Sequence, residues 1–232
     1  MNKAYDEVEW DFLEALLQKL GFQTGWIRLV MLCIRTVSFF VLVNGQLGSS
    51  FLPSRGLRQG DHLSPYLFLL VCEALSCNLT KLVQDGVING IRVSRRAPIL
   101  SQLFFADDSL FFVKAEEENC SRLKGLLDDY CLASGQLIDY EKSSLMFSAN
   151  TPEDVKANTS SIMGVRGIDN YGIYLVIPMT WGQSKKVALA YIRERVAKKI
   201  MGWKQGTLSM ARNEVLIKAI ATSCPSLSYD VF

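Results

Sequence analysis

Residues 103–113, LFFADDSLFFV, contain two apolar runs on either side of Asp107 and Asp108. Short apolar runs separated by a polar break predict a buried β-hairpin, with the two acids at its tip. Two carboxylates about 4 Å apart repel by roughly 4 kcal/mol at an effective dielectric constant near 20. A divalent cation removes this repulsion, and hard oxygen ligands favour Mg²⁺ or Mn²⁺ over zinc. An Asp-Asp hairpin tip is also a common solvated turn, so the pair alone leaves both interpretations open.

The rest of the pattern predicts helices interleaved with strands. Apolar residues at helical spacing predict helices at residues 9–20, 26–35, 64–83 and 116–132, and helices also dominate after residue 185. Ser64 is expected to cap the third of these helices, with Pro65 at its first helical position.

Strands are expected at residues 39–43, 46–51, 145–148 and 173–177. The first two are joined by Asn44-Gly45, the strongest short hairpin signal in the sequence. Hairpins and helices that interleave in this way favour an α+β fold, in which helices cover one face of an antiparallel sheet.

Composition indicates a folded, intracellular protein. The 232 residues are 49% hydrophobic and 21% charged, which allows one large domain or two smaller ones. The six cysteines form no CxxC pair and His62 is the single histidine, which argues against a zinc site and favours reduced thiols in the cytoplasm or nucleus. We expect no membrane association, because Arg28, Arg35 and Glu73 interrupt the longest apolar runs.

The charge is distributed unevenly. Residues 185–218 hold nine basic and two acidic residues, so the rest of the chain carries −5 of the total charge of +2. A basic segment of this kind suits binding to a phosphate backbone. The candidate nucleic-acid-binding residues are Lys185, Lys186, Lys198, Lys199 and Lys204. A solvated helix face explains the same pattern, since Leu189, Ile192, Val196 and Ile200 form an apolar stripe.

Five segments occur in the order found in one protein family. They are residues 3–10 (KAYDEVEW), 56–65 (GLRQGDHLSP), 105–108 (FADD), 133–136 with 142–143 (ASGQ and KS), and 203–204 with 214–219 (WK and EVLIKA). Together they cover nearly the whole chain and resemble the reverse transcriptases of non-LTR (LINE-type) retrotransposons, most closely those of plants.

The resemblance implies a right-hand polymerase palm at residues 1–180 and the start of a helical thumb-like region at 181–232. It implies that Asp107 and Asp108 help to hold two Mg²⁺ (or Mn²⁺) ions during nucleotidyl transfer. It further implies an RNA template, a DNA primer and deoxynucleoside triphosphates as partners. It leaves the oligomeric state open.

The same resemblance assigns roles to further residues. Tyr5 matches the aromatic residue under the sugar of the incoming nucleotide, which excludes ribonucleotides. Arg58, Gln59 and Gly60 match a loop that contacts the nucleotide and the template base, and Lys142 matches a residue proposed to protonate pyrophosphate. Without the resemblance, these residues are compatible with a core tyrosine, an ordinary turn and a surface lysine.

The chain also departs from the family pattern. The first catalytic aspartate of the family falls immediately before the position of Met1, and the fingers segment and the endonuclease precede it in the family. His62 replaces a proline, and Val176 and Arg212 replace glycines. We therefore expect this chain to be inactive by itself. The alternative function is that of a non-catalytic retrotransposon relic with weak metal and nucleic-acid binding.

Overall fold

The computed structural model of this chain describes residues 4–105, 107–168, 173–174, 177–178, 194 and 214. The chain divides into two compact units, residues 1–167 and 168–232. Nearly all of the described residues belong to the first unit. The expected domain boundary after residue 180 stays a prediction, and the helices expected after residue 185 lie outside the described part of the chain apart from single positions.

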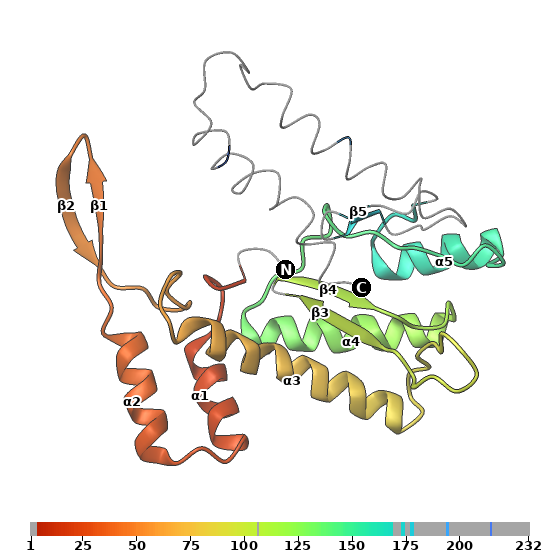
Figure 1. Cartoon of the computed structure of the whole chain (residues 1–232), viewed down its shortest axis with the longest axis horizontal. Helices are drawn as coiled ribbons and strands as arrows, with labels where there is room; N and C mark the ends of the chain where they lie inside the picture. The colour runs from red at the N-terminus through yellow and green to blue at the C-terminus, as the bar shows by residue number, and fades with distance from the viewer. Residues whose placement is uncertain are drawn as a thin grey trace. The chain divides into compact units, whose positions relative to one another are not determined.

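The first unit opens with a turn at residues 4–7, followed by the paired helices α1 (Trp10–Lys19) and α2 (Thr24–Arg35) (Figure 1). Both helices were predicted, with ends within two residues of those found. Leu13 and Leu17 of α1 are fully buried, as its helical spacing predicts.

A β-hairpin follows α2 and consists of β1 (Phe39–Val43) and β2 (Gln46–Phe51). Its bounds are those predicted from the Asn44-Gly45 turn. Both turn residues have positive φ, 50° for Asn44 and 79° for Gly45, as a two-residue turn matched to the twist of the strands requires.

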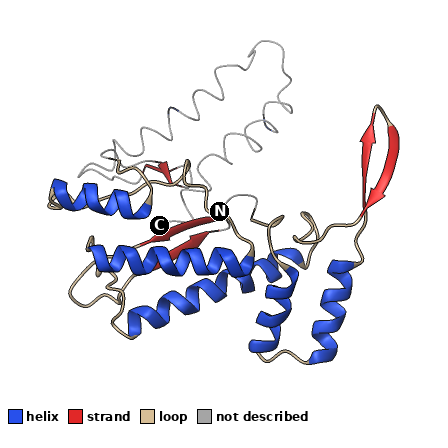
Figure 2. Ribbon diagram, turned by 180° about the vertical axis from the view of Figure 1, so that it is seen from behind, coloured by secondary structure: helices blue, strands red, loops and turns tan. Residues whose placement is uncertain are grey.

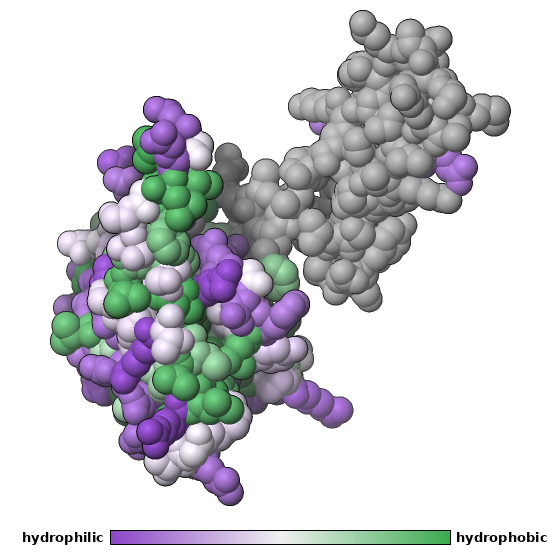
Figure 3. Space-filling model, turned by 90° about the vertical axis from the view of Figure 1, so that its left-hand side faces the viewer, coloured by the Kyte–Doolittle hydropathy of each residue, from purple (hydrophilic) through white to green (hydrophobic). Residues whose placement is uncertain are grey.

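The β1–β2 hairpin exposes apolar side chains. Figure 3 shows apolar residues gathered on the side of the first unit that carries this hairpin and α2. Those with at least half of their surface exposed are Phe40, Val41, Leu42, Val43, Leu47 and Phe51. No residue from 37 to 53 is charged, so the strands lack the charged side chains that commonly protect a sheet edge.

Helix α3 (Ser64–Gln84) runs through the core of the first unit. The prediction that Ser64 caps it was wrong: Ser64 is the first helical residue, and no side chain caps the helix. Pro65 lies in the first turn, where its missing N–H costs no hydrogen bond. The chain enters α3 through a turn in which the Asp61 carboxylate accepts a hydrogen bond from the Leu63 N–H at 2.8 Å.

Among the described residues, α3 is the one helix long and apolar enough to cross a membrane, with a mean hydropathy of 1.5. Glu73 therefore does not interrupt its apolar run as expected. A core helix of a water-soluble protein meets the same criterion. Leu67, Val71 and Leu75 of α3 are buried against neighbouring elements, whereas Tyr66 and Leu69 are exposed, and 28% of the apolar window is buried.

Helix α4 (Glu117–Ser134) packs against α3, and α5 (Glu153–Met163) packs against α4 (Figure 2). The Tyr130 hydroxyl of α4 donates a buried hydrogen bond to the Val71 carbonyl of α3 at 3.1 Å. Helix α4 was predicted to end near Gly135, which has a φ of 78° and forms its C-cap. Helix α5 was not predicted.

The described strands form three separate antiparallel pairs rather than one sheet: β1–β2, β3–β4 and β5–β6. The α+β class is confirmed, but one helix-covered sheet is not found among the described residues. The strand expected at residues 145–148 is reduced to a single bridge between Leu145 and Gly167. The strand expected at 173–177 is instead two short strands, β5 (Ile173–Tyr174) and β6 (Ile177–Pro178).

Candidate active site

The acidic tip, defined as Asp107 and Asp108, lies on the hairpin of β3 (Gln102–Phe105) and β4 (Asp108–Phe111). Phe105 pairs with Asp108 at the end of the ladder, which leaves Asp107 in the connecting turn. Both aspartates are exposed. The predicted hairpin and the position of its acids are therefore confirmed.

One face of this hairpin is fixed on the helices. The rings of Phe104 and Phe111 contact each other at 5.8 Å in an edge-to-face arrangement, and both pack against the core. The Gln102 amide donates hydrogen bonds to the Ser76 hydroxyl at 2.8 Å and to the Ser76 carbonyl at 3.2 Å. These contacts hold β3 against α3.

The other face is exposed, which corrects the expectation of a buried hairpin. Leu103 is 49% exposed and Phe105 is 53% exposed. Side chains alternate along a strand, and paired residues share a face, so Asp108 lies on the same open face as Phe105. A carboxylate there keeps its contact with solvent and is accessible to a cation.

The acidic tip offers two carboxylates, the oxygen donors that Mg²⁺ and Mn²⁺ prefer. Among the described residues, no group of three or more His, Cys, Asp or Glu side chains is arranged to hold a metal ion. The chemistry of the donors fits a hard divalent cation. Two carboxylates can supply only some of the ligands that such a cation requires.

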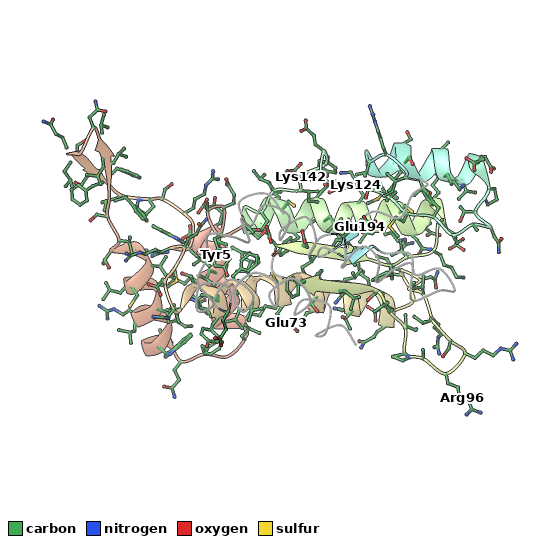
Figure 4. The ribbon with its side chains drawn as sticks, turned by 45° about the horizontal axis from the view of Figure 1, so that its top comes forward. Tyr5, Glu73, Arg96, Lys124, Lys142 and Glu194 are labelled. Carbon is green, nitrogen blue, oxygen red and sulfur yellow. The ribbon has the colours of Figure 1, made fainter. Side chains whose placement is uncertain are left out.

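The turn at residues 4–7 carries Tyr5, the predicted nucleotide-contacting aromatic residue. The Tyr5 ring stacks on the Phe68 ring of α3, with a centroid distance of 4.8 Å and an interplanar angle of 22° (Figure 4). Stacking on a core side chain leaves Tyr5 half-buried. The stacking holds the orientation of the ring, which stays partly accessible to solvent.

The loop at residues 56–60 lies against this turn, as the two motifs jointly suggest. The Leu57 N–H donates to the Tyr5 carbonyl at 2.7 Å, and the Gln59 amide donates to the Asp6 carboxylate at 3.3 Å. Gly56 has a φ of 90°, and a Cβ there would lie 2.7 Å from the Asp6 carbonyl oxygen. Only glycine permits this approach.

The structure therefore joins the loop that carries Gln59 to the turn that carries Tyr5. Arg58 and Gly60 belong to the same exposed loop. Gly60 has a φ of 85°, and no atom lies within 4 Å of a Cβ added to it. Its backbone conformation favours glycine, whereas the predicted close approach of a nucleotide stays a prediction.

Lys142 lies beyond the end of α4, on the side that also carries Lys124 (Figure 4). Its ammonium forms an ion pair with the Asp139 carboxylate at 3.1 Å, and its side chain is 82% exposed. Hydrogen bonding to Lys142 lowers the pKa of Asp139 below its ordinary value. The contact anchors Lys142 locally, and its role in protonating pyrophosphate stays a prediction.

The candidate nucleic-acid-binding residues Lys185, Lys186, Lys198, Lys199 and Lys204 lie outside the described residues. Their role stays a prediction from the sequence.

Sequence reasoning missed two sets of contacts to the turn at residues 4–7 and the start of α1. The first is an ion pair of Arg55 with Glu7 at 2.9 Å and with Glu9 at 3.5 Å. The second consists of two hydrogen bonds, from the Glu9 N–H to the Ser134 carbonyl and from the Gln136 side chain to the Ala4 carbonyl. Ser134 and Gln136 matched a family motif but were assigned no role. The one sequence signal for these contacts was a glutamine next to the glycine that ends the helix.

The described residues thus carry an acidic hairpin and, separately, a sequence motif on a turn that the core supports. The chain belongs to the reverse transcriptase family: the profile described as "Reverse transcriptase (RNA-dependent DNA polymerase)" matches residues 1–187.

Three relatives accompany this match, and two of them are named as proteins of transposable elements. An uncharacterized mitochondrial protein of Arabidopsis thaliana is 48% identical over 68 residues, which are 29% of this chain and 56% of the relative. The transposon TX1 uncharacterized 149 kDa protein of Xenopus laevis is 27% identical over 155 residues, which are 66% of this chain and 11% of the relative. The retrovirus-related Pol polyprotein from type-1 retrotransposable element R2 of Popillia japonica is 31% identical over 111 residues, 47% of this chain and 15% of the relative.

This chain therefore spans at most 56% of the length of these curated relatives. The expected kinship with non-LTR retrotransposon reverse transcriptases is confirmed.

Proposed function

We propose that this chain forms the palm, at residues 1–180, and the start of a thumb-like region, at 181–232, of an RNA-directed DNA polymerase from a LINE-type retrotransposon. Its partners are an RNA template, a DNA primer and deoxynucleoside triphosphates. The observation that carries the proposal is the acidic tip, because two consecutive carboxylates are exposed on a hairpin whose opposite face is fixed on α3. Membership of the reverse transcriptase family supplies the type of reaction.

In this proposal Asp107 and Asp108 bind Mg²⁺ or Mn²⁺. Two such ions, when bound, activate the primer hydroxyl and stabilise the leaving pyrophosphate. Tyr5 supports the sugar of the incoming nucleotide and excludes a 2′-hydroxyl, and Gln59 orients the nucleotide from the adjacent loop. Phosphoryl transfer of this kind depends mainly on positioning and on charge stabilisation.

A second candidate function is that of a non-catalytic relic that binds metal and nucleic acid weakly. Among the described residues, Asp107 and Asp108 belong to no group of three or more potential metal ligands, and two ligands alone would hold a metal ion weakly. Loss of a group that supports a metal ligand typically costs about 10–100-fold in metal affinity or activity, and loss of a ligand itself costs more. We therefore propose that the 232-residue polypeptide does not extend a primer by itself.

Titration with Mn²⁺ tests the metal site directly. Asp107→Asn with Asp108→Asn should reduce Mn²⁺ binding at least tenfold. The chain offers a matched control in its other consecutive pair, Asp128 and Asp129 of α4, since the same substitutions there remove the same charge. Neighbouring side chains on a helix do not face each other, so this control should leave binding unchanged. Equal binding by the wild type and the Asp107–Asp108 variant would exclude the acidic tip as the metal site.

Primer extension separates the two candidate functions. A longer polypeptide, in which the fingers segment of a close relative and the aspartate ahead of Met1 are joined to this chain, should extend a primer on an RNA template. Asp107→Ala should abolish that activity, and Tyr5→Ala should allow ribonucleotides to be incorporated. Extension by the 232-residue chain alone, abolished by Asp107→Ala, would show that another acid supplies the missing ligand. Asp6 is then the first candidate to test.

We also propose an intracellular location, in the cytoplasm or nucleus. In its support, the five cysteines among the described residues are free thiols, as expected in a reducing compartment.

A further inference from the structure

We propose that Gln136 is a positioning residue for the nucleotide site, because it holds the turn that carries Tyr5. The inference rests on the proposed polymerase function only for the role of Tyr5. Gln136 is fully buried, and its side-chain amide donates a 2.8 Å hydrogen bond to the Ala4 carbonyl. These two residues are 132 positions apart in the sequence.

Gly135 brings Gln136 to this position. It ends α4 with a φ of 78°, and an added Cβ would lie only 2.3 Å from the Glu7 carbonyl oxygen. The Ser134 carbonyl accepts a hydrogen bond from the Glu9 N–H at 2.9 Å. The backbone at the end of α4 therefore contacts residues 7–9, and the Gln136 side chain hydrogen-bonds to Ala4.

The loop containing Gly56 holds the same segment through different atoms. The Gly56 N–H donates to the Val8 carbonyl at 2.8 Å, and the Leu57 N–H donates to the Tyr5 carbonyl at 2.7 Å. The carbonyls of Ala4, Tyr5 and Val8 thus each receive a donor from a distant segment. Because the backbone on both sides of Tyr5 is fixed, its ring is held where it stacks on Phe68.

The other atom of the Gln136 amide supports a specific role for the side chain. Its Oε1 is buried and has no hydrogen-bond partner in the described part of the chain. A buried acceptor without a donor is unfavourable, and an apolar side chain of similar shape would avoid this cost. Packing alone therefore does not explain why a glutamine occupies position 136. The hydrogen bond from Gln136 Nε2 to the Ala4 carbonyl explains it.

Gln136→Met tests this inference, because methionine keeps the size of the side chain and removes the donor. Hydrogen exchange of the 232-residue chain should become roughly tenfold faster at the Gly56 and Leu57 amides, the loss expected when one supporting hydrogen bond is removed. Leu127→Ala is the control, since it removes a buried side chain of α4 that is not among these contacts. Urea concentrations are chosen to match the overall stabilities of the two variants.

The active longer polypeptide provides the second measurement. Gln136→Met should raise the KM for deoxynucleotides severalfold and reduce discrimination against ribonucleotides, whereas Leu127→Ala should change neither at matched stability. Unchanged exchange at Gly56 and Leu57 would overturn the inference. So would faster exchange with unchanged nucleotide discrimination. If the wild-type longer polypeptide has no activity, the proposed function fails, whereas the exchange result still decides whether Gln136 holds the turn.

Discussion

Gly135→Ala should be among the most destabilising substitutions in this chain that remove no atom. An alanine Cβ would lie 2.3 Å from the Glu7 carbonyl oxygen, whereas real Cβ atoms essentially never approach closer than 3.0 Å. A left-handed backbone costs a residue other than glycine about 1–2 kcal/mol. Relief of the collision must also displace residues 7–9 and weaken the hydrogen bonds at Glu9 and Gln136, each worth about 1 kcal/mol. We therefore expect a total loss of roughly 3–4 kcal/mol.

Gly164→Ala is the matched control for this prediction. Gly164 also ends a helix, has a φ of 67°, and has no atom within 4 Å of an added Cβ. It should lose only the backbone contribution of about 1–2 kcal/mol. Urea unfolding followed by circular dichroism measures both variants, provided that the slope of the free energy of unfolding against urea is unchanged. Equal losses at Gly135 and Gly164 would refute the close contact between the end of α4 and Glu7.

Three further predictions follow from other parts of the chain. Burial raises the pKa of the Cys72 thiol from 9.0 to about 11, so the folded state keeps a proton that the unfolded state releases. Stability should therefore fall as the pH rises from 9 to 11, and in urea titrations Cys72→Ala should show a shallower fall. Leu42→Glu with Leu47→Lys places opposite charges on a cross-strand pair of the exposed β1–β2 hairpin. These charges should reduce concentration-dependent association of the protein, as measured by light scattering. Unchanged association would show that the hairpin is not the surface through which the protein associates. Affinity for nucleic acid should fall steeply with salt, and Lys198→Ala with Lys199→Ala should lower the salt slope by about 1–2. An unchanged slope would indicate that these lysines do not contact the nucleic acid.

Local sequence signals predicted most of the fold of residues 4–135. The Asn44-Gly45 turn determined both strand ends of its hairpin, since few other residues accept positive φ at two consecutive positions. Helix α5 was missed because its single fully buried residue is Thr159, so its sequence carries little apolar periodicity. The strand expected at residues 145–148 failed because short apolar runs form strands only where a partner strand is present. Within residues 145–148, Leu145 alone pairs, in an isolated bridge with Gly167.

The candidate site likewise has a part that the sequence predicted and a part that it did not. The acidic tip was predictable because its residues are adjacent in sequence and flanked by apolar strands. The contacts of Gly56, Gly135 and Gln136 with residues 4–9 were not, since they join segments tens of residues apart and act mainly on backbone carbonyls. Backbone contacts of this kind produce no hydrophobic pattern in the sequence. The only sequence sign of them is a glycine at a position where no turn or helix end already explains it.

The positions of the family departures bear on the choice between polymerase and relic. Of the three departures His62, Val176 and Arg212, only His62 lies among the described residues, where it is exposed in the turn before α3. The two glycines whose added Cβ atoms would collide with residues 4–9, and the buried Gln136, all match the family motif. The one departure in the described part therefore lies at an exposed position, where the fold tolerates substitution. The exposed position of His62 therefore does not by itself favour a decayed fold over the proposed polymerase.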